Sequence, residues 1–480
     1  MCNLLCLCVA LLLTGPLGVQ LDSIPGCGYD LDMFFRRYGT FSGGISLPDD
    51  KHATLNASIH SIGLPARLRV PISFGSSISA QVLVNVGEAV SAGQRLVQGA
   101  SPEADIFSPL GGRVSAMATA QVPTREGFVS LPAIELTALE GPWDDREPAG
   151  EKGGFNWRQA DPAALRERLA QGSLPTHRMN VRPLSQWIAK AIRHGCRTLI
   201  ANAMENQPYV SCDHRMLAEH GKQVLQGLAI LARAIEAPEV LLAADQRRLG
   251  DYKQLLAASR HYRISPVALP HKYPIGADPI LVKVLKNREM PPGGTTMQVG
   301  CAVVGPAICL AIYRWIVVGR RALGRIITLG GERAQVHGNF WVPFGTLCHD
   351  LLPGAADLIH GGPMVGLRCS LHSVVTPGTE AVLALDPTPV RLATPCMRCG
   401  WCTDHCPARL NVAALNDAFE LGQTDHARRL GAVACIECGV CSYICPSCLP
   451  LSQRVKRLKR VLRGTFRRGI QLSKPEGSGP

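Results

Sequence analysis

Two cysteine motifs near the end of the chain constrain its fold and chemistry more than any other feature. Both read C-x-x-C-x-x-C-x-x-x-C-P, and their cysteines are Cys396, Cys399, Cys402 and Cys406, then Cys435, Cys438, Cys441 and Cys445. Four thiolates at this spacing are typical ligands of a [4Fe–4S] cluster. A zinc site needs only cysteine pairs, which leaves the third cysteine and the C-P of each copy without a role. We therefore expect two [4Fe–4S] clusters.

The fourth cysteine of each motif is expected to bind the cluster of the other motif, as in two-cluster ferredoxins. One cluster then takes Cys396, Cys399, Cys402 and Cys445, and the other takes Cys435, Cys438, Cys441 and Cys406. Residues 411–433, between the motifs, contain no proline and space Val412, Leu415 and Phe419 as a helix does. This predicts a helical dicluster module, in which Cys448 is left as a free thiol.

Composition limits the compartment and the partners. Of the 19 cysteines, those outside the two motifs are scattered without a disulfide framework, which favours a reducing compartment. The 50 Lys and Arg against 37 Asp and Glu give a net charge of +13, which favours an acidic protein partner or an anionic lipid surface. Aromatic residues are only 5% and interleave with no basic patch, so no nucleic acid is expected.

The first residues do not belong to a recognisable domain. Residues 1–20 carry no charge, lack the positive region of a signal peptide, and are interrupted by Gly15-Pro16. We treat residues 1–32 as a leader and expect translation to start at or near Met33, with a membrane anchor as the alternative. At 480 residues the chain is long enough for several domains.

Residues 64–139 read as short strands separated by Gly and Pro turns. Within them, residues 84–96 and 108–114 pair a hairpin with a following strand, the pattern of a lipoyl-like barrel sandwich. The loop after the hairpin has no lysine that could carry a swinging arm. We therefore expect a scaffold or docking domain at 33–142, followed by a linker at 143–160.

Residues 161–318 alternate helical and strand patterns, with helices from Pro162 and at 216–234 and strands at 197–201 and 240–243. Such alternation predicts a Rossmann-like α/β domain, with a nucleotide site at the carboxyl ends of parallel strands. No G-x-G-x-x-G motif follows a strand. The apolar run 300–319 contains Arg314, so we expect a buried helix there and not a membrane span.

Several segments together carry a family resemblance. They are GGISLPDDK (43–51), NAMENQPYVSCDHRML (202–217), HKYPIGADPILVKVL (271–285), VPFGT (342–346), GGPMVG (361–366) and CIECGVCSYICPS (435–447). In order and spacing they resemble the RnfC subunit of the Rnf-type (Rnf/Rsx) ion-translocating electron transport complex, a relative of the flavin-binding subunit of respiratory complex I. The resemblance runs from Met33 to about Leu451.

The resemblance implies a multidomain α/β plus β fold. After the barrel sandwich and the α/β domain it places a β-grasp (SLBB) domain at 319–385, a ferredoxin domain at 386–452 and a basic tail at 453–480. It also implies FMN in the α/β domain and NADH as a substrate, in a pocket that includes Asn202, Glu205, Tyr273 and Gly276.

The chain departs from the family pattern at this pocket. Arg168, Ala170 and Gln171 stand where relatives have glycines, Gln207 replaces a second Glu, and Met179 replaces a lysine. Side chains obstruct the approach of backbone N–H groups to a phosphate. Arg168 is expected to compensate in part, because its planar fork suits phosphate oxygens.

Two functions therefore stay open. In the first, the chain is the iron–sulfur input module of an ion-translocating NADH:ferredoxin-type oxidoreductase. In the second, it is an iron–sulfur relay and docking subunit with a degenerate nucleotide site, fed by a protein donor. Both place it on the cytoplasmic side of the cell inner membrane, with membrane subunits of the complex and a soluble ferredoxin or flavodoxin as partners.

The tail has two interpretations. Eight arginines and lysines lie between Arg454 and Arg468 without an acidic residue, and Val455, Leu458, Val461 and Leu462 recur at helical spacing. A basic amphipathic helix of this kind commonly lies on anionic lipid. The alternative is a helix that caps the cluster domain.

Overall fold

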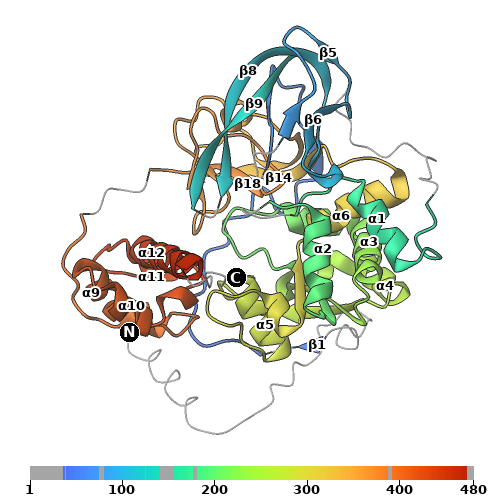
Figure 1. Ribbon diagram of the computed structural model, residues 1–480. Helices are drawn as coiled ribbons and strands as arrows, with labels where there is room; N and C mark the ends of the chain where they lie inside the picture. The colour runs from blue at the N-terminus through green and yellow to red at the C-terminus, as the bar shows by residue number, and fades with distance from the viewer. Residues whose placement is uncertain are drawn as a thin grey trace, which may run out of the picture. The chain divides into compact units, whose positions relative to one another are not determined.

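The computed structural model describes residues 36–37, 39–74, 80–124, 126–140, 155–176, 181–387 and 392–472, with side chains described to residue 464 (Figure 1). The expected leader and most of the expected linker lie outside these ranges. Within them, no helix is both long enough and apolar enough to cross a membrane.

The barrel-sandwich prediction corresponds to two antiparallel sheets around one core. The strands of the first sheet, in spatial order, are β3 (Leu68–Pro71), β9 (Gly127–Glu140), β8 (Gly111–Thr124) and β5 (Ala89–Val90). Those of the second are β4 (Ala80–Val82), β6 (Arg95–Gly99) and β7 (Ile106–Phe107). Leu68, Leu96 and Ile134, one from each of three strands, are fully buried between the sheets. The long β8–β9 hairpin is prominent in Figure 1.

The α/β domain contains a five-stranded parallel sheet. Its order is β1 (Arg36–Arg37), β12 (Ser265–Leu269), β11 (Glu239–Asp245), β10 (Thr198–Ala203) and β13 (Cys301–Val304). The chain moves from β10 outward through β11 and β12, then returns to place β13 on the other side of β10. A crevice is expected where the order reverses, at the carboxyl ends of β10 and β13.

Helices accompany this sheet. They are α1 (Pro162–Ala170), α2 (Leu184–Arg193), α3 (Cys212–Ala234), α4 (Lys253–His261), α5 (Asp278–Lys286) and α6 (Pro306–Tyr313). The prediction of one buried helix over 300–319 is wrong in part. Its first residues form β13, which pairs with β10, and α6 continues into a π-helical turn at Arg314–Val318. Burial is confirmed, since Arg314 is only 7% exposed and stacks on Trp341 at 4.1 Å.

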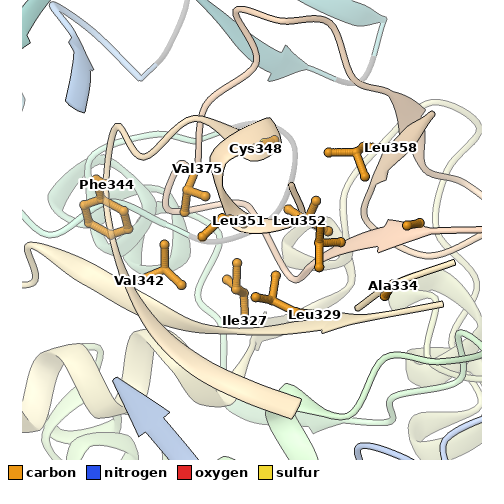
Figure 2. Packing of buried hydrophobic residues seen from close by; sticks show 12 residues of the cluster. Ile327, Leu329, Ala334, Val342, Phe344, Cys348, Leu351, Leu352, Leu358 and Val375 are labelled. Atoms are coloured by element: carbon orange, nitrogen blue, oxygen red, sulfur yellow. The ribbon is translucent and has the colours of Figure 1, made fainter. Parts of the chain in front are cut away.

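A third sheet follows. Its order is β17 (Leu367–Arg368), β16 (Leu358–His360), β18 (Ala381–Ala384), β14 (Gly324–Gly330), β15 (Gly338–Pro343) and β2 (Ile59–Ser61). β14 and β15 form an antiparallel hairpin, and β18 lies parallel to β14. The short helix α7 (Cys348–Leu351) contributes to the core on one face, where Ile327, Val342, Phe344 and Leu358 are buried (Figure 2).

The last part of the chain is helical. Its helices are α8 (Trp401–Asp404), α9 (Val412–Glu420), α10 (Thr424–Arg429), α11 (Val440–Tyr443) and α12 (Leu451–Leu472). The expected helical insert is two helices, because the chain turns at Gly422, whose φ is +65°. The apolar side of α12 packs into the same core as Leu415, burying Val455, Leu458 and Leu462. The basic tail is therefore, up to residue 464, an integral helix of the cluster domain.

Candidate iron–sulfur and nucleotide sites

The eight motif cysteines gather into two groups that cross between the motifs. Cys396, Cys399, Cys402 and Cys445 line one cavity with about 380 Å³ of space free of protein atoms. Cys406 lies instead with Cys435, Cys438 and Cys441. Burial raises the pKa of each of these three thiols, and the nearby Cys406 raises it further. This is the grouping that the cross-ligated assignment requires. Cys448 is not among the cysteines that line the cavity.

The backbone around the two groups repeats at a fixed distance along the chain. Left-handed backbone occurs at Arg398 and Gly400 in the first loop and again at Glu437 and Gly439, each 39 positions later. The short helices α8 and α11 follow these positions with the same offset. In the second loop, the Glu437 N–H donates to the Cys435 sulfur at 3.4 Å.

Burial disfavours ionisation of most of these thiols unless a metal is bound. It raises the pKa of Cys402, Cys406 and Cys435 above the ordinary value, and that of Cys438 to about 12. A thiol that binds metal is deprotonated by the charge of the metal. Buried thiols of this kind are poor free nucleophiles.

The arrangement also bears on the zinc alternative. Within the ranges that the structure describes, no three Cys, His, Asp or Glu side chains converge closely enough to hold one metal ion. Zinc requires such convergence, with ligands about 2.0–2.3 Å from a single centre. A [4Fe–4S] cluster is larger and offers a separate iron to each thiolate. Each group supplies the four thiolates that a [4Fe–4S] cluster takes as ligands.

A large cleft opens at the carboxyl ends of β10 and β13. It holds about 4680 Å³ of space free of protein atoms, part of it open to solvent, and extends from the α/β domain to residues 435–439 of the second cysteine loop. Asn202, Glu205, Tyr273 and Gly276 all line it. The structure thus brings together the four residues that the resemblance assigned to the pocket.

Two of these four residues are engaged with each other. Asn202 donates from its Nδ2 to the carbonyl oxygen of Gly276 at 2.8 Å and to Asp278 at 3.2 Å. Gly276 in turn donates its N–H to the Asn206 side chain at 2.8 Å. A Cβ at Gly276 would lie 2.5 Å from the Met204 carbonyl oxygen, so only glycine fits. These residues shape the floor of the cleft.

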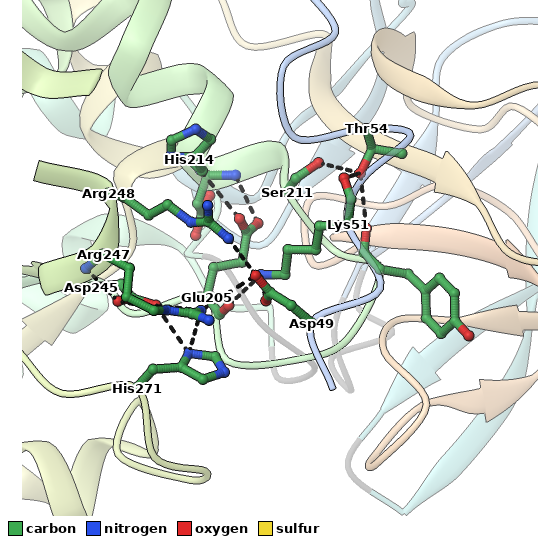
Figure 3. A network of polar contacts seen from close by, with 12 residues as sticks. Asp49, Lys51, Thr54, Glu205, Ser211, His214, Asp245, Arg247, Arg248 and His271 are labelled. Atoms are coloured by element: carbon green, nitrogen blue, oxygen red, sulfur yellow. Dashed lines mark hydrogen bonds and ion pairs between the residues drawn. The ribbon is translucent and has the colours of Figure 1, made fainter. Parts of the chain in front are cut away.

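Glu205 is occupied as well, as Figure 3 shows. Its carboxylate accepts the N–H groups of Asp213 at 2.9 Å and His214 at 3.3 Å, at the beginning of α3. The carboxylate therefore caps that helix and meets its positive dipole end. Burial nevertheless raises the pKa of Glu205. Lys51, from the segment before the barrel sandwich, donates to the Glu205 carbonyl oxygen at 2.5 Å.

Sequence reasoning missed the charged network beside Glu205 (Figure 3). Asp49 forms ion pairs with Arg247 and Arg248, which follow β11. Asp245 pairs with Arg247 at 2.8 Å and with His271 at 3.0 Å. Although burial raises it, the hydrogen bonds from His271 and Arg247 bring the pKa of Asp245 below its ordinary value. The network anchors the segment around Asp49 to the α/β domain.

The loop that was expected to bind a phosphate packs instead against Trp315. Arg168 stacks on Trp315 at 4.3 Å, and its carbonyl oxygen accepts the Trp315 Nε1–H at 2.7 Å. A Cβ at Gly172 would lie 2.7 Å from the Trp315 ring. The Arg168 guanidinium thus covers the tryptophan, and Arg168 is not among the residues that line the cleft.

The backbone N–H groups of this loop also have hydrogen-bond partners within the chain. The N–H groups of Gln171, Gly172 and Ser173 donate to carbonyl oxygens three or four residues back, at 3.1–3.2 Å. Of the described residues of this loop, Thr176 reaches the cleft, and Arg168, Ala170 and Gln171 are not among the residues that line it. His177 and Met179 lie outside the described ranges. The described residues of this loop therefore do not form a phosphate cradle.

Gln207, which stands in place of an acidic residue, joins three parts of the protein. Its Oε1 accepts the N–H of Met364 at 3.1 Å, and a Cβ at Gly362 would lie 2.5 Å from its side chain. It also hydrogen-bonds Tyr273, whose hydroxyl reaches Cys438 in the second cysteine loop. Gln207 is thus a connecting residue at the wall of the cleft.

Comparison with protein families matches three segments in order. The RnfC barrel sandwich hybrid domain matches residues 39–137, the Nuo51 FMN-binding domain 182–314, and the 4Fe-4S dicluster domain 388–446. These confirm the barrel sandwich, the α/β domain related to a flavin-binding subunit, and the dicluster module. The flavin-domain match begins at residue 182, beyond the loop that Arg168 and Trp315 close.

Among curated proteins, the chain is similar to the RnfC subunits of ion-translocating oxidoreductase complexes. It is 30% identical to that of Edwardsiella ictaluri, over 78% of this chain and 48% of that protein. It is 28% identical to that of Serratia proteamaculans, over 78% of this chain and 54% of that protein. It is 28% identical to that of Rhodobacter capsulatus, over 91% of this chain and 84% of that protein. The chain thus spans about half the length of the first two relatives. A solved NAD+-reducing [NiFe]-hydrogenase is 16% identical over 67% of this chain and 64% of that chain, with a TM-score of 0.43, too low to support an argument.

Proposed function

We infer that this chain, a homologue of the RnfC subunits of ion-translocating oxidoreductase complexes, is an iron–sulfur electron-transfer subunit of such a complex. The observation that carries the proposal is the crossed grouping of the eight motif cysteines around two separate sites. Cys396, Cys399, Cys402 and Cys445 would hold one [4Fe–4S] cluster. Cys435, Cys438, Cys441 and Cys406 would hold the other. When bound, the clusters supply one-electron transfer.

The two sets of ligands face different surroundings. Cys435 and Cys438 border the cleft of the α/β domain. Cys399 is exposed, and Met397 and Trp401 beside it are 64% and 53% exposed. Large apolar side chains of this kind are enriched where proteins bind one another. The second site thus faces inward, and the first presents a surface to a partner that exchanges electrons with the module.

We further propose that the nucleotide site is degenerate and that the chain acts as a relay and docking subunit. Two observations support this. The N–H groups of Gln171 to Ser173 are hydrogen-bonded within the chain, and Arg168 stacks on Trp315. Gln207 supports it as well, since its side chain is committed to Met364 and Tyr273. Electrons would then come from a protein donor such as ferredoxin or flavodoxin, and not from NADH through FMN.

Two further assignments belong to this proposal. Residues 319–385 would form an SLBB-type β-grasp domain, since β18 lies parallel to the first strand of the β14–β15 hairpin. The chain would lie peripherally on the cytoplasmic side of the inner membrane, bound to membrane subunits of the complex. Contact of α12 with anionic lipid would use its exposed cations, such as Arg457 and Arg463, while Val455, Leu458 and Leu462 stay in the cluster core.

Metal and flavin analysis of anaerobically purified protein tests the proposal. We expect about eight iron and about eight acid-labile sulfide per chain, about four for each cluster, with flavin well below one per chain. Tightly bound zinc in place of iron would contradict the cluster assignment. Stoichiometric flavin would contradict the relay assignment while leaving the clusters intact, so the two parts of the proposal fail separately.

A further inference from the structure

A buried ion pair lies against the second cysteine loop. Lys459, on α12, is 4% exposed. Its Nζ donates to the carbonyl oxygen of Cys435 at 2.5 Å and to the Glu437 carboxylate at 2.6 Å. Both partners belong to the loop that would hold the second cluster. A lysine is rarely buried in this way unless it is paired. The helix α12 therefore holds a positive charge in a fixed position beside the second cysteine loop.

Among the residues that the structure describes, the first cysteine loop has no equivalent buried ion pair. Arg398 occupies the position that corresponds to Glu437, with the same left-handed backbone. Its side chain is 80% exposed and pairs only loosely with Asp417, at 3.5 Å. Lys459 and Glu437 have side chains that are 5% and 15% exposed. The two sites share one backbone design but differ in the buried charge beside them.

Buried charge acts strongly on a bound cluster. Reduction adds a negative charge, so a cation beside the cluster favours the reduced state and an anion disfavours it. Solvent screens an exposed charge, whereas a buried one is screened much less. Lys459 also polarises the Cys435 carbonyl directly. Its position lets it act on the second cluster far more than on the first.

Building on the proposed clusters, we propose that Lys459 and Glu437 set the reduction potential of the second cluster in opposite directions. Lys459 raises this potential and Glu437 lowers it. Neither residue binds iron, and both act through the Cys435 loop. The pair thereby biases where an electron resides between the cleft side and the exposed side of the module. The basic tail has in this way a role inside the domain, separate from any contact with lipid.

Redox titration monitored by electron paramagnetic resonance tests this on the full chain. We expect Lys459→Met to lower the reduced-to-oxidised ratio of the second cluster at least tenfold at a fixed potential, about 59 mV for a one-electron couple. Glu437→Gln should raise that ratio by a similar factor. Lys459→Arg, which keeps the charge, should restore most of the wild-type potential.

Arg457→Met is the matched control, because Arg457 lies on the same helix but is exposed. It should leave both potentials unchanged, and the potential of the first cluster should stay constant in all variants. Equal shifts of both clusters, or shifts of the same sign for Lys459→Met and Glu437→Gln, would overturn the proposal. If Lys459→Met loses iron, Glu437→Gln decides alone by the sign of its shift. Absence of iron in the wild-type protein would instead refute the proposed function.

Discussion

The hydroxyl of Tyr273 donates a hydrogen bond of 2.6 Å to the carbonyl oxygen of Cys438. It connects the floor of the α/β cleft directly to the second cysteine loop. Around it, Tyr273 is buried with Leu47 and Val440 in a small apolar cluster. The loop is therefore held in place by the α/β domain and by the segment before the barrel sandwich. Electron transfer between the module and the cleft side would benefit from this fixed geometry.

The crossed grouping of thiols predicts which substitutions act together. Cys406→Ser should abolish or convert the same cluster as Cys435→Ser, although the two residues belong to different motifs. Cys445→Ser should affect the same cluster as Cys396→Ser. Electron paramagnetic resonance of the reduced proteins distinguishes the two signals. Cys448→Ser is the control and should retain both, because Cys448 is not among the residues that line the first site.

If Cys406→Ser instead removed the same signal as Cys396→Ser, each motif would hold its own cluster. The crossed assignment would then be wrong.

Gln207→Glu restores the acidic residue of the family pattern, yet we expect a loss of stability and no gain in NADH binding. A carboxylate still accepts the Met364 N–H but cannot donate to Tyr273, and it adds a charge at a half-buried position. The expected cost is about 1–3 kcal/mol, measured by denaturant unfolding. Gln186→Glu, at an exposed site on the same cleft, is the control.

Glycines at Ala170 and Gln171 should not add affinity, because Trp315 still holds the loop through the Arg168 carbonyl. Tight NADH binding by such a variant, measured by calorimetry, would show that the closed loop is not the obstacle.

Because His360 is buried, we expect the stability of the protein to depend on pH. It is 1% exposed, and burial, with a smaller effect of Arg325, lowers its pKa to about 4. In the unfolded chain its pKa is about 6.5, so between these values the unfolded state binds a proton that the folded state does not. Stability should therefore fall as the pH drops below about 6.5, by about 2 kcal/mol at about pH 5.

His360→Gln should flatten this decline in unfolding experiments between about pH 7 and about pH 5. The exposed His52→Gln should not. His214, whose pKa burial also lowers to about 4, should leave a residual slope. An unchanged slope in His360→Gln would exclude His360 as a source of the effect.

Truncation distinguishes the two roles of the tail. Ending the chain after Leu451 removes Val455, Leu458 and Leu462 from the cluster core, each worth about 1.5–3 kcal/mol when buried. We expect this protein to lose iron and to unfold at a lower temperature. A chain that ends after Gly464 should keep both clusters. Full iron content in the shorter protein would mean that α12 is dispensable for the core.

Sequence reasoning succeeded where the relevant residues are close along the chain. The cysteine spacing, the strand–helix alternation of the α/β domain and the hairpins of the barrel sandwich are local patterns, and each is present in the structure. It failed where partners are distant. β2 has only three residues, yet it completes a sheet by pairing with β15, and nothing in Ile59–Ser61 indicates that partner.

The candidate site shows the same division. The resemblance identified residues that line the cleft, but not their partners, because the Asp49–Arg248 and Lys459–Glu437 pairs form only when the chain has folded. Counting missing glycines indicated a weakened phosphate site. It could not reveal that Trp315 packs against Arg168 and Gly172 and closes the loop.

The central claim is that the chain relays electrons through two clusters without oxidising NADH itself. Its most direct test is to mix the anaerobic, iron-replete protein with excess NADH and follow reduction of the clusters by absorbance and paramagnetic resonance, with dithionite added afterwards. We predict no appreciable reduction by NADH, even with added FMN, and full reduction by dithionite. Rapid reduction of both clusters by NADH would contradict the claim and would identify the chain as an active NADH-oxidising protein.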